Sequence, residues 1–372
     1  MKITGIETIP IRVPIKPELA IKSGRGGSHS VSPFLIVKVH TNDGLVGLGE
    51  VSCTPRWSGE DQVTAAHFIK TILAPLLIGQ EPRDIERLSA KIRKALFGHP
   101  FTKAAIEMAL WDILGKTADL PVYRLLGGPV RDFVPTKWSI SGVEPMRAAQ
   151  IAEWAVQQGF RVMKVKVGID DAQDVARVRA VRNAAGSGVR LGIDANGAWA
   201  PGKAVEMIQR MREFDIAFAE QPVAPGDVDR LAYVRSRAGV PVIADESVYT
   251  SEDALALVRA VAADVLSVYV GKSGGIAPAR RIAAIADAAD VACTIGSNLE
   301  MGVGSAAMIH LAMATPAFGI SDYPCDIIGP LFYTDELLTE TLPICGGEAR
   351  PPHGAGLGVE LNEEKVRRYR VD

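Results

Sequence analysis

The sequence predicts an α+β unit followed by a closed (β/α) barrel, an α/β fold. Residues 2–14 and 34–51 have the alternation of strands, and helical periodicity follows between residues 60 and 117. From about residue 134, short apolar runs alternate with amphipathic segments at a repeat of roughly 25 residues, which is typical of a parallel sheet with helical crossovers. About eight such runs follow one another, and eight is the strand number of a closed barrel.

The N-terminal unit comprises two strand regions and three helices. We expect strands at 2–14 and 34–51, the second folded as a hairpin at the Asn-Asp-Gly sequence of 42–44. The expected helices cover 60–77, 82–97 and 102–117. Strands followed by a block of helices make an α+β domain, which we place at residues 1–125.

The barrel is predicted at residues 126–355. Its expected strands are WSIS, VMKVKVG, LGIDAN, IAFAEQP, PVIADES, VLSVYVGK, ACTIGSN and FGISDYP. A doubly wound open sheet is the alternative, but the glycine-rich turn that usually follows the first strand of that fold is missing. We expect the last segment, 356–372, to return to the N-terminal domain.

Composition and charge narrow the class of protein. Apolar residues make up 48% and charged residues 23% of the 372 residues, which is ordinary globular composition. The net charge is −2, and the basic residues are scattered, so no nucleic-acid partner is expected. The apolar runs are short and broken, so neither a membrane segment nor a signal peptide is predicted. A cytoplasmic enzyme fits these observations.

Four cysteines are widely separated along the chain. They are Cys53, Cys293, Cys325 and Cys345. Because no two of them form a CxxC pair, we expect reduced thiols and neither a zinc site nor a disulfide framework.

Polar residues close almost every apolar run of the predicted barrel. In chain order they are Lys164 and Lys166; Asp194 and Asn196; Glu220 and Gln221; Asp245, Glu246 and Ser247; Lys272; Ser297, Asn298 and Glu300; Asp322 and Asp326. The carboxyl ends of barrel strands form the active site, so these side chains are expected to meet there.

Three carboxylates in this set end successive strands: Asp194, Glu220 and Asp245. A lone Asp is more often a helix cap, but adjacent parallel strands lie only about 4.8 Å apart. Three carboxylates that close would repel one another unless a cation held them. Ligation by carboxylates alone is the preference of a hard cation, so we predict that these residues bind Mg²⁺.

Two lysines lie two residues apart in the second run, so their side chains share one face of a strand. We interpret this face as the wall of a polar site. An amine next to a second amine and a divalent cation has a lowered pKa, so Lys166 is predicted to be a general base, with Lys164 beside it binding the substrate carboxylate. Lys272, on the sixth run, would face Lys166 across the metal.

The chain resembles the enolase superfamily, in the muconate lactonizing enzyme (muconate cycloisomerase) subgroup. The motifs that carry the resemblance are KVKVG at 164–168, DANGAW at 194–199, EQP at 220–222, ADES at 244–247 and GKSGG at 271–275, with GLGE at 47–50 and GSNLEMGVGSAA at 296–307. The resemblance implies a capping domain on a modified (β/α)7β TIM-like barrel and Mg²⁺ on Asp194, Glu220 and Asp245. It also implies Lys166 and Lys272 as the acid/base pair, a small carboxylic acid substrate, and a homo-oligomer, either an octamer or a dimer.

Departures from related subgroups narrow the reaction. The mandelate racemase subgroup has a His on the seventh strand, which this chain lacks, and dipeptide epimerases have a DxD where this chain has Asp326 and then Ile328. A muconate cycloisomerase is therefore the predicted activity. The alternatives are a dehydratase of a small hydroxy acid, a racemase or epimerase of an N-acyl amino acid or dipeptide, and a non-catalytic binding barrel.

The remaining predicted contacts concern the substrate. From the barrel we expect contacts by Asn196, Ser297, Glu300 and Asp326. From the capping-domain loops at 22–30 and 54–60 we expect contacts by Arg25 and Trp57. Arg25 would meet a second carboxylate, whereas Trp57 would either close over the substrate or pack the domain interface.

Overall fold

The structure is a computed structural model that describes residues 1–19, 21–24, 27–318 and 321–371. The N-terminal part begins with an antiparallel sheet of order β1-β4-β5, formed by β1 (Ile3–Pro14), β4 (Val31–Thr41) and β5 (Val46–Ser52). Between β1 and β4, the chain forms a short antiparallel hairpin of β2 (Ile21–Ser23) and β3 (Gly27–His29). The predicted strands and the predicted hairpin are confirmed.

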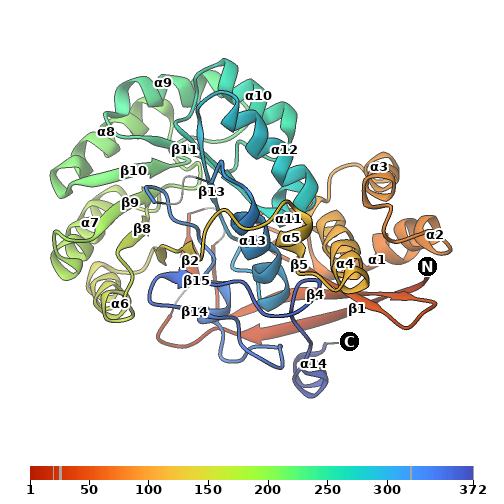
Figure 1. Cartoon of the computed structure of the whole chain (residues 1–372). Helices are drawn as coiled ribbons and strands as arrows, with labels where there is room; N and C mark the ends of the chain where they lie inside the picture. Colours follow the sequence, from red (N-terminus) through yellow and green to blue (C-terminus); the bar gives the residue numbers. More distant parts are fainter. Residues whose placement is uncertain (20, 25–26, 319–320, 372) are drawn as a thin grey trace.

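One face of this sheet is covered by helices (Figure 1). They are α1 (Gln62–Phe68), a π-helical turn (Ile69–Leu73), α2 (Ala74–Leu77), α3 (Ile85–Ala95) and α4 (Pro100–Ala118). Helix α4 approaches β5 so closely that a Cβ on Gly47 would collide with the backbone of Ala109, and one on Gly49 with the backbone of Ala105. Glycines in the GLGE segment thus let the helix and the strand share one core.

The barrel is built on a parallel sheet of seven strands, arranged in chain order from β7 to β13. The strands are β7 (Trp138–Ile140), β8 (Val162–Lys166), β9 (Arg190–Asp194), β10 (Ile216–Glu220), β11 (Val242–Ala244), β12 (Val265–Val268) and β13 (Ala292–Ile295). The helices around them are α6 (Pro145–Gln157), α7 (Asp171–Ala185), α8 (Pro201–Met211) with a 3₁₀ turn (Arg212–Phe214), α9 (Val228–Ala238), α10 (Ser251–Arg259), α11 (Val270–Ser273), α12 (Ile276–Asp287) and α13 (Gly302–Ala314). Figure 1 shows α6 to α12 as an arc outside the strands.

Two details of the predicted barrel are wrong. The sixth strand ends at Val268, and Lys272 lies in the short helix α11 that follows. The predicted eighth strand is not a strand in the described residues of that segment. Its place is taken by single backbone bonds: Asp326 N donates to Ile295 O of β13 at 2.8 Å, and Lys137 N, just before β7, donates to Cys325 O at 2.9 Å. The segment at 325–326 therefore connects the first and last strands.

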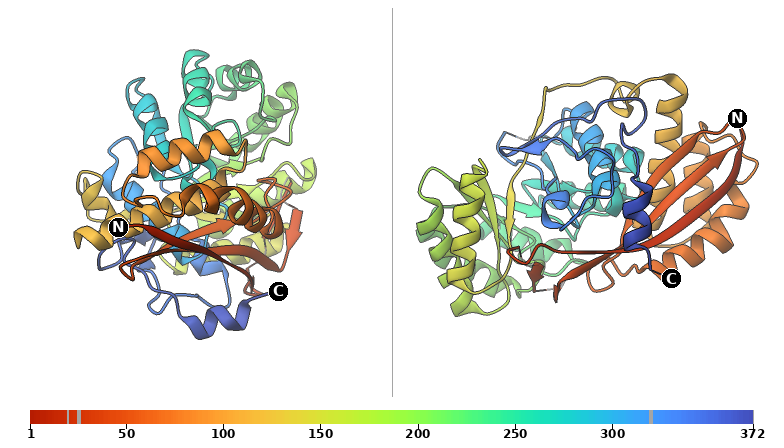
Figure 2. Two further views of the ribbon diagram at one scale, coloured as in Figure 1. Left: turned by 90° about the vertical axis from the view of Figure 1, so that its right-hand side faces the viewer. Right: turned by 90° about the horizontal axis from the view of Figure 1, so that it is seen from below.

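The C-terminal part returns to the N-terminal sheet. It contains a 3₁₀ turn (Gly329–Phe332), β14 (Ile344–Cys345), β15 (Glu348–Ala349) and α14 (Glu363–Tyr369). Two short elements, α5 (Val122–Leu125) and β6 (Val134–Pro135), precede the barrel. Strand β15 pairs with β6, and α14 packs beside β1, as Figure 2 shows. The domain limits at 125 and 355 remain predictions.

All four cysteines, for which no disulfide is expected, are free in the structure. Three are buried, and Cys345 is exposed. Within the ranges that the structure describes, no helix is both long enough and apolar enough to cross a membrane.

Buried carboxylates join the N-terminal domain to the barrel. Glu50 of β5 accepts hydrogen bonds from Met301 N (2.7 Å) and Gly304 N (2.9 Å), at the N-terminus of α13. Glu107 of α4 accepts from Ile276 N (2.7 Å) at the N-terminus of α12. The positive ends of two barrel helices thus hold two glutamates of the other domain.

These glutamates give the fold a predicted pH dependence. Burial raises the pKa of Glu50 from 4.5 to about 8, although its two backbone hydrogen bonds act to lower the pKa. Between about pH 4.5 and 8 the folded state therefore holds a proton that the unfolded state has lost, so the free energy of unfolding decreases as pH rises. We expect Glu50→Gln to reduce this decrease by about 1–4 kcal/mol over that range.

The measurement is chemical denaturation from pH 5 to pH 8, with Glu153→Gln, an exposed glutamate on α6, as the matched control. The control should keep the wild-type slope. An unchanged slope in Glu50→Gln would contradict the prediction.

Candidate active site

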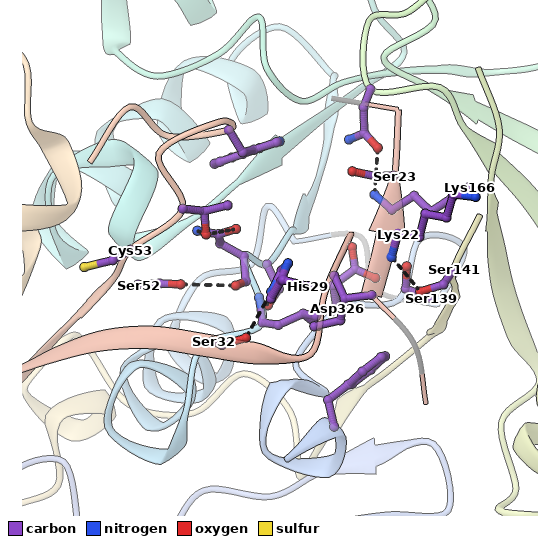
Figure 3. Close-up of a pocket in the computed structure, with 18 of the residues that line it drawn as sticks. Lys22, Ser23, His29, Ser32, Ser52, Cys53, Ser139, Ser141, Lys166 and Asp326 are labelled. Atoms are coloured by element: carbon purple, nitrogen blue, oxygen red, sulfur yellow. Dashed lines mark hydrogen bonds between the residues drawn. The ribbon is translucent and has the colours of Figure 1, made fainter. Parts of the chain in front are cut away.

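A pocket lies between the N-terminal domain and the carboxyl ends of the barrel strands. The residues lining it include Ile21, Lys22, Ser23, His29, Ser32, Pro33, Phe34, Ser52, Cys53, Thr54 and Trp57 from the N-terminal domain, and Ser139, Ser141, Lys164, Lys166, Asn196, Tyr269, Ser297, Asn298, Leu299, Asp326, Phe332 and Tyr333 from the rest of the chain. In Figure 3, Ser52 and Cys53 lie on one side of the pocket and Ser139, Ser141 and Lys166 on the other.

The two lysines of β8 both point into the barrel, so the interpretation of their shared strand face as the wall of a polar site holds. Lys164 is buried, and its Nζ pairs with Glu220 Oε1 (2.7 Å), Asp326 Oδ2 (2.8 Å) and Asp194 Oδ2 (3.3 Å). Lys166 Nζ donates to Asp194 Oδ2 (2.6 Å) and Asn196 Oδ1 (3.0 Å). Its side chain keeps 18% of its surface exposed, against 4% for Lys164.

The three predicted metal ligands lie at successive strand ends. Asp194 and Glu220 are the last residues of β9 and β10 and are register partners, and Asp245 directly follows β11. All three are buried. Burial alone would raise the pKa of Asp194, but Lys166 and Lys164 outweigh it and lower that pKa.

Glu220 differs from Asp194 in the balance of the same forces. Burial raises the pKa of Glu220, and the neighbouring carboxylates Asp194, Asp326 and Asp245 raise it further, against the effect of Lys164. One oxygen, Glu220 Oε2, is buried without a hydrogen-bond partner. The carboxylates are therefore close enough to repel one another.

In this structure, the positive charge next to the three strand-end carboxylates comes from lysine ammonium groups. Among the described residues, no three His, Cys, Asp or Glu side chains are arranged to hold a metal ion. The donor chemistry nevertheless fits a hard divalent cation, because the ends of β9, β10 and β11 offer buried carboxylate oxygens, and Glu220 Oε2 has no other partner. A bound cation would require the lysine contacts of these carboxylates to rearrange.

Lys272 occupies a different environment from Lys166. Its side chain is fully buried, and Nζ donates to Asp245 O (2.6 Å), Asp245 Oδ1 (2.5 Å) and Ser267 O (3.0 Å). Its Nζ lies 4.2 Å from the ring centroid of Tyr269, and it is Tyr269 that lines the pocket. The two lysines are separated by β9, β10 and β11, as the predicted strand order requires.

Most of the predicted substrate contacts come together at the pocket. Asn196, Ser297, Asp326 and Trp57 line it. Trp57 also packs the interface: it stacks on Tyr269 with ring centroids 5.5 Å apart and donates from Nε1 to Glu246 Oε1 (3.1 Å). Its closing over a substrate remains a prediction.

Three other residues predicted at the site, Glu300, Asp322 and Arg25, are not placed at the pocket by the structure. Glu300 does not line the pocket and instead accepts hydrogen bonds from Ser297 Oγ (2.6 Å) and Asn298 N (3.0 Å), so it shapes the loop after β13. Asp322 is exposed and pairs with Arg190. Arg25 lies outside the described residues.

Sequence reasoning missed two polar residues at this site, Tyr269 and Lys137, and it named Gln221 only as a polar residue at a strand end. Tyr269 Oη donates to Asp245 Oδ2 (2.8 Å), and Gln221 Oε1 accepts from Asp245 N (2.8 Å), so both position this carboxylate. Lys137 is buried beside Asp326. Gln221 belongs to the EQP motif and Tyr269 lies in the same apolar run as Lys272, whereas nothing in the apolar surroundings of Lys137 indicates where its side chain points.

Comparison with known proteins agrees with this arrangement of strands. Residues 146–365 match the family model "Enolase C-terminal domain-like", and residues 7–127 match "Mandelate racemase / muconate lactonizing enzyme, N-terminal domain". The chain belongs to the enolase superfamily. Its relatives place it in the muconate lactonizing enzyme subgroup, and the chain is an enzyme of this superfamily.

Three relatives of this enolase-superfamily chain illustrate the range of activities named among its relatives. It is 32% identical to N-succinyl-L-Arg/Lys racemase of Bacillus cereus, over 100% of this chain and 98% of the relative. It is 34% identical to muconate cycloisomerase 1 of Rhodococcus opacus, over 99% and 98%. The crystal structure of 2-chloromuconate cycloisomerase from Rhodococcus opacus 1CP matches with a TM-score of 0.95 at 32% identity, covering 100% of both chains.

Proposed function

We propose that the protein is a Mg²⁺-dependent isomerase that forms an enediolate by moving a proton next to a substrate carboxylate. The single observation that supports this best is the pocket wall itself, where a partly exposed lysine lies beside successive strand-end carboxylates. A binding module has no need of a lysine held in that position, and the superfamily relatives are named isomerases.

Lys166 is the proposed base. It lines the pocket, is the more exposed of the two β8 lysines, and is oriented by Asp194 and Asn196. Lys164 is the proposed carboxylate contact: burial acts to lower its pKa, but Asp326, Glu220 and Asp194 outweigh burial and raise that pKa, so this lysine stays charged. A permanent cation next to a base is suited to holding an anionic substrate.

Asp194, Glu220 and Asp245 would hold the metal. Mg²⁺ bound there would neutralise the second negative charge of the enediolate. Tyr269 and Gln221 would keep Asp245 in position through the hydrogen bonds described above. The family is known for divalent-metal chemistry, and the assignment of Mg²⁺ to these residues is the proposal.

Among the reactions of the family, a muconate-type cycloisomerase is proposed for this chain. The supporting observation is the asymmetry of the two lysines: Lys166 lines the pocket, whereas Lys272 is fully buried behind Tyr269. A lactonization can use one lysine for the proton transfer, with the other as a nearby charge. A racemase needs a base on each face of the substrate carbon in every turnover.

An N-succinyl amino acid racemase is the second candidate. It is favoured by the match to the Bacillus cereus racemase over the whole chain and by the presence of Lys272 on the opposite wall. A dehydratase of a small hydroxy acid would use the same enediolate, and a dipeptide epimerase is less suited, because Ile328 replaces the second Asp of the expected DxD. A homo-oligomer, as an octamer or a dimer, remains a prediction.

The lining of the pocket points to a substrate with two carboxylates. Asp326 is the only carboxylate among the described lining residues, whereas Lys22 lines the pocket with no ion pair to any described residue. A substrate ammonium would find little compensation here, and a second carboxylate would find Lys22.

We expect Lys22→Gln to raise the KM for a dicarboxylic acid by about tenfold, because a hydrogen bond to a charged group contributes about 1.5–3 kcal/mol. Steady-state kinetics on cis,cis-muconate and on a monocarboxylic analogue would measure it. The control is Lys38→Gln, which removes a lysine of β4 that pairs with Glu363 of α14. An equal effect of Lys22→Gln on both acids would contradict the dicarboxylate assignment.

The reaction itself is tested by incubating the enzyme with Mg²⁺ and a library of mono- and dicarboxylic acids, with cis,cis-muconate and N-succinyl amino acids first. Lactone formation from muconate would support the cycloisomerase. Loss of optical activity of an N-succinyl amino acid without lactone formation would support the racemase and overturn the first proposal.

A further inference from the structure

Lys137 is a buried lysine that the proposed reaction does not use. It lies between β6 and β7, and only 1% of its surface is exposed. Burying an ammonium group is costly unless several partners compensate it, so its contacts define what it does.

The contacts of Lys137 converge on the segment that connects the first and last strands. Nζ donates to Pro324 O (2.6 Å) and lies 3.4 Å from Thr294 Oγ1 of β13 and 3.4 Å from Asp326 Oδ2. Thr294 Oγ1 also donates to Pro324 O (3.1 Å). One lysine thus contacts both the last strand and the segment at 324–326.

Asp326 Oδ2 is shared between two ammonium groups. Lys137 lies on one side at 3.4 Å, and Lys164 lies on the other at 2.8 Å. Lys164 is in turn paired with Glu220 and Asp194, and Asp194 with Lys166. Three lysines and three carboxylates therefore form one connected, charge-matched chain across the end of the barrel.

We propose that Lys137 is a positioning residue of the active site, which balances the charge of Asp326 and so limits how strongly Asp326 draws Lys164 away from Glu220 and Asp194. It does not touch the proposed substrate position, since it does not line the pocket. The proposal rests on the proposed function only for the metal at Glu220 and Asp194.

Removing Lys137 has two consequences that act in the same direction. Among the described residues, Asp326 is left with Lys164 as its only cation, so Lys164 is held more firmly at Asp326 and less firmly at the other two carboxylates. The barrel interior also gains one negative charge. Both changes favour a divalent cation at Glu220 and Asp194, whereas mere loosening of the barrel would weaken a metal site.

The experiment compares wild type, Lys137→Met, Asp326→Asn and the double variant, each prepared free of metal. The first measurement is the thermal midpoint of unfolding, and the second is calorimetric titration with Mg²⁺ alone. Lys116→Met is the matched control, because Lys116 also forms an ion pair with a buried carboxylate, Asp112, and neither of the two lines the pocket.

We expect Lys137→Met to lower the midpoint, and Asp326→Asn to restore at least half of that loss in the double variant, because it removes the unbalanced charge. Asp326→Asn should not rescue Lys116→Met. We also expect Mg²⁺ to bind Lys137→Met about threefold more tightly or better than wild type. It should bind the double variant no more tightly than wild type, because no charge at position 326 then draws Lys164 away from Glu220 and Asp194.

Additive losses of thermal midpoint, with no rescue by Asp326→Asn, would overturn the proposal. So would Mg²⁺ binding to folded Lys137→Met that is equal to or weaker than that of wild type. If wild type itself does not bind Mg²⁺, the proposed function fails, and the thermal cycle alone decides the role of Lys137.

Discussion

Lys166→Ala is expected to lower turnover by about 10²–10⁴-fold, which is the usual contribution of a general base. The reason is geometric, because Lys166 lines the pocket and its Nζ is fixed by Asp194 and Asn196. Two other described lysines line the pocket: Lys164, which has three carboxylate partners, and Lys22, which belongs to the opposite domain. Steady-state turnover of the acid identified by screening is the measurement. Lys203→Ala, a surface lysine paired with Asp171 on the outside of the barrel, should retain wild-type turnover.

Comparing Lys166→Ala with Lys272→Ala separates the candidate reactions. Exchange of the α-hydrogen that is retained in Lys272→Ala and lost in Lys166→Ala would favour the cycloisomerase, because one lysine then handles the proton. Loss in both variants would favour the racemase. Full activity in Lys166→Ala would refute the assignment of the base.

Asp245→Asn is expected to weaken Mg²⁺ binding by about 100-fold or more, because it removes a charged oxygen ligand from a hard cation. Asp245 is also the partner of Lys272, Tyr269 and Gln221, so its backbone position is well defined. Isothermal calorimetry with Mg²⁺ measures the effect directly.

Glu246→Gln is the matched control for this prediction. Glu246 follows Asp245 in the chain, is equally buried, and accepts hydrogen bonds from Trp57 Nε1 and Asn196 Nδ2. Glu246→Gln should weaken Mg²⁺ binding far less than Asp245→Asn does. If Asp245→Asn bound Mg²⁺ as tightly as wild type and Glu246→Gln did not, Glu246 would be the ligand and the assignment would be wrong.

The parts of the site that lie on regular strands could be predicted from the sequence. Lys164 and Lys166 alternate with apolar residues, so the period of two puts them on one face, and Asp194 and Glu220 each end an apolar run. Strand ends in a parallel sheet meet at one edge, and the structure places these side chains there.

The parts that depend on irregular backbone or distant contacts could not. Tyr269 and Val270 continue the β-like pattern of β12, yet the chain turns into α11, so the sequence gives no sign that Lys272 lies behind Tyr269. Lys137 is placed by Pro324 and Thr294, which are more than 150 residues away in the chain. Glu300 bonds to its own loop, a local choice that competes with pointing into the pocket.

Hydrogen exchange in D₂O is the decisive test of whether this enzyme forms an enediolate reversibly. Wild-type enzyme with Mg²⁺ would be incubated with muconolactone and with N-succinyl amino acids, and the recovered acids would be analysed by mass spectrometry and proton NMR. We expect at least one of them to gain one deuterium on the carbon next to its carboxylate, and we expect the exchange to be lost without Mg²⁺ and in Lys166→Ala. Exchange that continues at the wild-type rate in Lys166→Ala, or the absence of exchange in every acid of the library with a folded, Mg²⁺-bound enzyme, would contradict this expectation.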